Sequence, residues 1–120
     1  MSNSTIVTAV HPDSKIRILL RSALQDPTRT VLTDHSWADL LADAAAPRPS
    51  VIILHRSFIG QDCVDVLALF QERWPGIDIV VLPESLEDEG TRRDALIQLL
   101  RQVDQLLAPK SDVVLQEHPA

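Results

Sequence analysis

The chain has 120 residues, a length that fits one domain with its own hydrophobic core and is too short for two. Seventeen acidic residues against 11 Lys and Arg give a net charge of −6, which argues against a surface that binds nucleic acid or an anionic membrane. The single cysteine supplies neither an internal disulfide nor paired metal ligands, and no apolar run reaches the roughly 18 residues of a membrane span. We expect a cytoplasmic domain.

Short apolar runs alternate with segments of helical periodicity. Four runs predict strands, over residues 6–10, 30–33, 51–54 and 77–82. The segments between them predict three helices, which begin at Asp13 or Ser14, at Asp34 or Ser36, and at Asp62 with Asp65 in its first turn. These connections are long enough for crossover helices, so the chain predicts a three-layer α/β fold with a parallel sheet.

The last third of the chain is less regular. A helix is predicted over residues 91–107, and Pro109 stops it. Val113-Val114-Leu115 is a candidate for a fifth strand before a polar end. We therefore assign residues 1–109 to the domain and 110–120 to a tail or short fifth strand.

Two stretches of the chain carry a family resemblance. Residues 6–24 end a strand with His11-Pro12 and continue into the helical Arg17-Ile18-Leu19-Leu20-Arg21. Residues 50–82 contain Gly60-Gln61-Asp62 before Val66-Leu67, and then Glu72-Arg73-Trp74-Pro75-Gly76-Ile77. In order and spacing they resemble the CheY-like receiver domain of bacterial two-component response regulators, most of all regulators of the LuxR type. The resemblance implies a flavodoxin-like, doubly wound sheet of order 2-1-3-4, with the fifth strand left open.

The resemblance also implies where the chemistry of a receiver would lie. In that family two acids after the first strand hold Mg²⁺, and an Asp that ends the third strand accepts a phosphoryl group. Alignment on His11-Pro12 places Ala9 and Val10 at the acidic pair, and the third run places His55 at the phosphoacceptor. Pro83 replaces the hydroxyl residue that ends the fourth strand. Without carboxylates for metal or phosphate, we expect no enzymatic activity, metal or cofactor.

The last predicted helix suggests how the domain could act. Its residues Leu96, Leu99, Val103 and Leu106 have the 3-4-3 spacing of a packed helix seam, which favours a homodimer or a contact with another regulatory protein. Leu100 and Leu107 widen the stripe, and this suits packing on the sheet instead. By resemblance the helix is either an extended fourth helix of the family or its last helix.

Two functions are compatible with these patterns. We interpret the chain as a degenerate receiver that works without phosphorylation, through protein contacts, in bacterial signalling or transcription control. The alternative is a sensor that binds a small ligand at the C-terminal ends of the first and third strands, beside His55 and Phe58.

Overall fold

The computed structural model describes residues 5–59, 65–82, 86 and 88–107. Its strands are β1 (Thr5–Val10), β2 (Arg29–Asp34), β3 (Val51–Leu54) and β4 (Asp78–Val81). Its helices are α1 (Ser14–Leu24), α2 (Trp37–Ala42), α3 (Val66–Arg73) and α4 (Arg92–Leu107), with a short 3-10 helix, η1 (Arg56–Phe58), after β3. These elements follow the predicted order along the chain. The candidate fifth strand at 113–115 lies outside the described residues.

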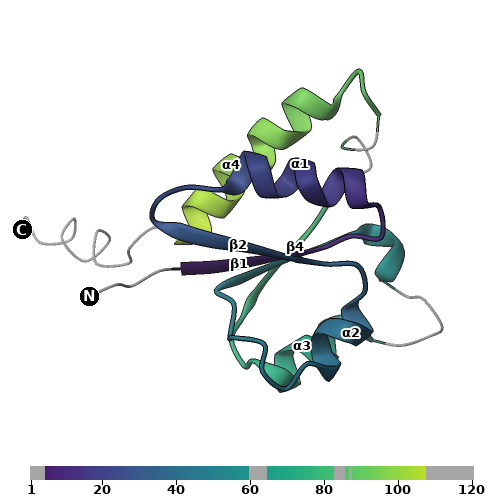
Figure 1. The fold of residues 1–120 in the computed structure, drawn as a ribbon, viewed down its shortest axis with the longest axis vertical. Coiled ribbons are helices and arrows are strands. Elements are labelled where there is room, and N and C mark those ends of the chain that lie inside the picture. Colours follow the sequence, from purple (N-terminus) through teal and green to yellow (C-terminus); the bar gives the residue numbers. More distant parts are fainter. Residues whose placement is uncertain (1–4, 60–64, 83–85, 87, 108–120) are drawn as a thin grey trace, which may run out of the picture.

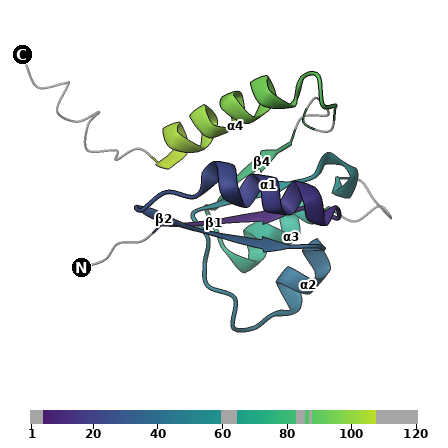
Figure 2. The ribbon, with the colours of Figure 1, turned by 45° about the horizontal axis from the view of Figure 1, so that its top comes forward.

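The four strands form one parallel sheet in the order β2-β1-β3-β4. α1 and α4 cover one face of the sheet, and α2 and α3 cover the other (Figures 1 and 2). β3 is buried along its whole length, as expected for a central strand between two helical layers. The architecture is a three-layer α/β fold of flavodoxin-like topology, which confirms the predicted fold class.

Successive side chains of each strand point to opposite faces, so the sheet divides the core into two clusters. The cluster on the α1–α4 face includes Val7, Ala9, Val31, Ile53, Leu20 and Leu99. The cluster on the α2–α3 face includes Val10, Ile52, Leu54, Leu40, Phe70 and Trp74. Apolar helix stripes and apolar strand faces therefore meet in both layers.

Short polar side chains cap the helices. The side chain of Asp13 accepts a hydrogen bond from the backbone N–H of Lys15, and that of Ser36 accepts one from Asp39. Both residues were among the predicted caps. The predicted start of α3 is wrong, because Asp65 is the cap of this helix and accepts from the N–H of Ala68. Asp62 lies outside the described residues.

α2 is a helix of six residues. Asp43 follows it as the C-cap, and the chain then passes through Pro47 and Pro49 before β3. Proline lacks the N–H that would continue a helix, so the segment through Pro47 and Pro49 runs to β3 as an irregular chain. This leaves part of the sheet near β2 without a helix above it.

α4 lies beside α1 and not on the α2–α3 face (Figures 1 and 2). A right-handed crossover from β4 to a strand on its outer side would place a helix on the α2–α3 face. α4 therefore packs beside α1 and covers the part of this face, over β3, that α1 leaves open. No helix in the described part of the chain is long and apolar enough to cross a membrane.

Candidate functional site

The C-terminal ends of β1 and β3 lie side by side, where open α/β sheets bind their ligands. Val10 and Leu54 are partners in the parallel register, so the residues after them, His11 and His55, leave the sheet together. The backbone N–H of His55 donates to the carbonyl of Val10 at 3.2 Å, and that of His11 donates to the carbonyl of Asp34 at 3.0 Å. The sheet ladder thus fixes the start of both loops.

The imidazole rings of His11 and His55 are in contact. Their centroids are 4.4 Å apart and their planes are 76° apart, an edge-to-face arrangement. His11 is 2% exposed, while His55 is half-buried and also lies edge-to-face with Phe58 at 6.1 Å. The imidazole rings of His11 and His55 therefore lie together between the ends of β1 and β3.

Both imidazoles accept hydrogen bonds at Nδ1. The backbone N–H of Asp13 donates to His11 at 2.9 Å, and the N–H of Ser57 donates to His55 at 3.1 Å. A backbone N–H can only donate, so each neutral ring carries its hydrogen on Nε2. His55 also places Nδ1 2.6 Å from the Ser57 hydroxyl oxygen, and it caps η1. Both histidines thus hold the shape of the loop that comes after them.

The residues predicted at the acidic pair are core residues. Ala9 and Val10 are fully buried, and their side chains belong to opposite faces of the sheet, Ala9 under α1 and α4 and Val10 under α2 and α3. Mg²⁺ requires oxygen ligands, and two aliphatic side chains with imidazoles beside them do not fit it. Pro83 lies outside the described residues.

Asp34, which the sequence predicted only as a possible helix cap, lies at the end of β2, the strand next to β1. Asp34 ends β2, opposite Val10, and its Oδ1 accepts from the N–H of His35 at 2.8 Å. The imidazole of His35 lies between two carboxylates, with Nδ1 3.4 Å from Asp34 and Nε2 2.7 Å from Asp39. Their ligand atoms fall within 4.8 Å of one another, but the imidazole already lies beside both carboxylates, and exposed acidic groups of this kind are common without a metal. The sequence feature that could have indicated this contact is the spacing of His35 and Asp39, which are four residues apart at the start of a predicted helix.

The apolar stripe of α4 faces the protein's own core. Leu99 and Val103 are buried in the cluster under α1 and α4, and Leu96 and Leu106 pack against it, half-buried. A second copy does not reach Leu99 and Val103 in this fold, because α1 and the sheet already cover them. Of the two predictions for this stripe, packing on the sheet therefore fits Leu99 and Val103, and a seam with a second copy does not. Ile97, on the opposite side of α4, is exposed.

One hollow in the described part of the chain borders the loop after β3 and the end of β4. Phe58 is buried in the α2–α3 cluster. A hollow of about 510 Å³ is lined by Arg56, Ile59, Val81 and Leu82, so it lies on the β4 side of the two histidines. The sensor alternative stays a prediction.

Comparison of the chain with models of known protein families gives no match, and a search of curated proteins gives none either.

Proposed function

We propose that the protein is a regulatory domain of receiver-like fold that accepts no phosphoryl group and acts through protein contacts. The observation that carries this proposal is the contact between His11 and His55. It fills the place between β1 and β3 where the resembling family has its carboxylates.

The chemistry at this place opposes phosphoryl transfer. An acceptor must offer a nucleophilic atom, and a cation must neutralise the transferred phosphate. In the tautomer that the hydrogen bonds define, His55 has its Nδ1 lone pair facing the N–H of Ser57 and its hydrogen on Nε2. Ala9 and Val10 supply no metal ligand. Among the described residues that end β1 and β3, there is neither a prepared nucleophile nor a carboxylate ligand for Mg²⁺.

The regulatory role rests on the resemblance to receivers. Without a phosphorylation switch, we expect the output to come from surfaces that bind other proteins. The partner that we propose is a second copy of the chain or another regulatory protein of the same pathway.

The test is incubation of the protein with acetyl phosphate and Mg²⁺, followed by intact mass spectrometry. We expect no adduct, while an active receiver domain treated in parallel gains about 80 Da, the mass of one phosphoryl group. An acid-labile adduct of that mass on the wild-type chain contradicts the proposal.

A variant separates the two missing parts of the site. His55→Asp supplies an acceptor carboxylate but leaves Ala9 and Val10 unchanged, so we expect no adduct from it either. His55→Asn, which has the same shape without the charge, is the matched control for folding. Phosphorylation of His55→Asp in Mg²⁺ would show that the strand ends still hold a metal despite their aliphatic side chains.

A further inference from the structure

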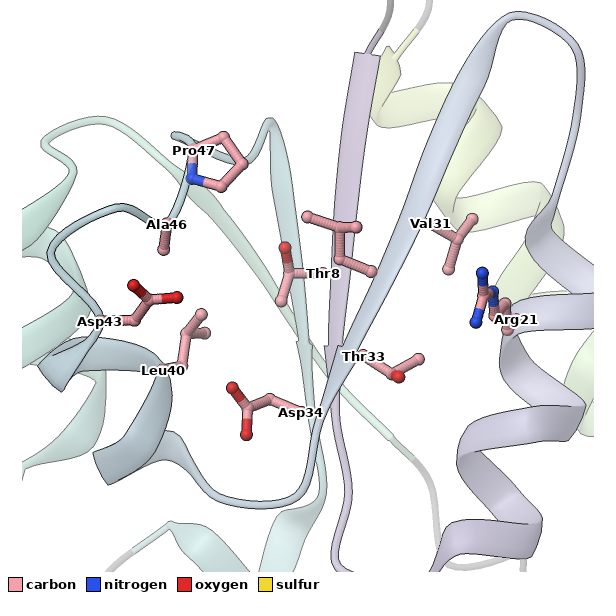
Figure 3. Close-up of a pocket in the computed structure, with 10 residues that line it drawn as sticks. Thr8, Arg21, Val31, Thr33, Asp34, Leu40, Asp43, Ala46 and Pro47 are labelled. Atoms are coloured by element: carbon pink, nitrogen blue, oxygen red, sulfur yellow. The ribbon is translucent and has the colours of Figure 1, made fainter.

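A hollow of about 310 Å³ lies at the β2 edge of the sheet and reaches both sides of this strand (Figure 3). One side lies between β2, α2 and the chain that continues from α2. Thr8, Asp34, Leu40, Asp43, Ala46 and Pro47 line it on this side, and the structure describes all of them. The hollow is separate from the two histidines between β1 and β3. A ligand site here is therefore independent of the proposed function.

The shortness of α2 explains the hollow. The helix ends at Ala42, and the irregular chain through Pro47 passes to one side of β2 (Figure 3). Leu32, which pairs with Thr8 in the β1–β2 register and so shares its face of the sheet, is left 38% exposed. An apolar strand residue of this size is normally covered by the adjacent helix.

Thr8 places a hydroxyl group in the floor of this hollow. Its residue is 3% exposed, whereas Val7, Ala9 and Val10 around it in β1 are aliphatic and buried. Among the residues that the structure describes, none forms a hydrogen bond with the Thr8 hydroxyl, although the residue borders the open space. The residue is buried but its hydroxyl opens onto the hollow, so a ligand there would supply the hydrogen-bond partner that the described residues do not.

The rim of the hollow is anionic. Asp34 and Asp43 lie on either side of Leu40, with their carboxylates turned toward the same space (Figure 3). Each uses Oδ1 to accept from a nearby backbone N–H, Asp34 from His35 at 2.8 Å and Asp43 from Ala45 at 3.0 Å. Arg21 is the cation among the lining residues, and it lies across β2 on the α1 side (Figure 3).

We propose that this hollow binds a small organic ammonium compound. The charged group would lie between the carboxylates of Asp34 and Asp43 and hydrogen-bond to the Thr8 hydroxyl, which can accept as well as donate. The apolar body would lie against Leu40, Ala46 and Pro47. The volume of about 310 Å³ also includes space beside Arg21, Val31 and Thr33 on the other side of β2, so the part next to Thr8 is smaller and admits only a compact molecule.

The test uses three compounds of similar size and different charge. Benzylammonium, benzyl alcohol and benzoate are titrated into ¹⁵N-labelled protein, and the amide shifts are measured by NMR. For benzylammonium we expect saturable shifts at Thr8, Asp34 and Asp43, with a Kd of about 1 mM or lower. Benzyl alcohol binds at least about fivefold more weakly, since it cannot form the charge-assisted bonds, and benzoate does not bind. Equal binding of the alcohol, or no saturable shift with the amine, overturns the proposal.

Variants locate the binding. Asp43→Asn keeps an oxygen for the N–H of Ala45 but loses the charge, and we expect at least about a fivefold loss of affinity for benzylammonium. Thr8→Val keeps the shape and removes the hydroxyl, with an expected loss of about threefold. Asp94→Asn, an exposed acid on α4, is the control and leaves the affinity unchanged. The spectrum of each variant reports whether it is folded, and unchanged binding by folded Asp43→Asn overturns the site.

Discussion

At the scale of single residues, Asp26 anchors the turn between α1 and β2. Its Oδ1 accepts from the Thr28 hydroxyl at 2.7 Å and from the Thr28 backbone N–H at 2.9 Å. These hydrogen bonds favour the charged carboxylate and lower the pKa of Asp26 below its ordinary value of 3.8. Since the pKa is lower in the folded state than in the unfolded state, the resulting stability is present above pH 3.8 and is lost as the pH falls through the folded pKa.

We therefore predict that Thr28→Val raises the pKa of Asp26 toward its ordinary value and slightly lowers the free energy of unfolding at neutral pH. The difference in stability between wild type and variant should shrink as the pH falls below about 4, where Asp26 becomes protonated. A carboxyl titration by NMR, with urea unfolding at each pH, measures both effects. Thr30→Val, in the neighbouring strand, is the control, and an unshifted Asp26 in Thr28→Val would show that the hydroxyl is not the cause.

Local sequence predicted the residues whose partners are near in the chain. Asp13 and Ser36 were expected as caps because a cap bonds to an N–H two or three residues away. The contact of His11 with His55 depends on the register of β1 and β3, so neither residue reveals it alone. The sequence did not indicate Thr8 either, because its hydroxyl lies beside a hollow only as a result of the short α2, which is distant in the sequence.

At the scale of secondary-structure elements, a long-range ion pair joins the start of β2 to the end of α4. Nη2 of Arg29 lies 2.6 Å from Oδ1 of Asp104. The side chain of Arg29 is 9% exposed and that of Asp104 is 53% exposed. No described residue forms a hydrogen bond with Nε or Nη1 of Arg29. The guanidinium is thus buried with only part of its hydrogen-bonding capacity used, a costly arrangement.

Because Arg29 is buried and Asp104 is half exposed, we expect removal of each charge to change the free energy of unfolding differently. We predict that Arg29→Met, which keeps an apolar stem without the buried charge, leaves the free energy of unfolding unchanged or raises it. Asp104→Asn removes the compensating charge and should lower it by about 1–3 kcal/mol, toward the low end because Asp104 is half exposed. Urea unfolding of both single variants and the double variant gives the coupling. A larger loss in Arg29→Met than in Asp104→Asn would mean that the buried charge is not the costly element.

The elements themselves were largely predictable from the sequence. Four apolar runs and the helical spacing between them sufficed, because strands and helices bury faces with different periods. The position of α4 was not predictable in the same way. Its stripe shows which side of the helix is apolar, but not whether α1, the other face of the sheet or a second copy covers that side.

At the scale of the whole molecule, substitution of Leu99 distinguishes a role in core packing from a role in association with a second copy. It is buried under α1, so Leu99→Ala should lower the free energy of unfolding by about 2–5 kcal/mol at any protein concentration. Ile97→Ala, on the exposed side of the same helix, is the control and should cost less than about 1 kcal/mol. Thermal unfolding of each variant at low and high concentration gives the comparison.

The same measurement tests the proposed partner. If the protein pairs with a second copy, the wild-type unfolding midpoint rises with protein concentration, because association stabilises only the folded chains. Light scattering should then give a mass near twice 13.3 kDa. A midpoint independent of concentration would rule out a second copy as the partner. A Leu99→Ala loss that grows with concentration would place Leu99 in an interface.

The position of α4 also bears on how the chain folds during synthesis. The four strands are complete once Val81 has been made, but their α1 face then lacks the cover that Ala95, Leu99 and Val103 provide. A nascent chain at this stage exposes Val51, Ile53 and Val80 on a twisted sheet, a surface on which chaperones and other unfinished chains bind. The native state becomes accessible only when α4 has also been made and packs beside α1 over β3.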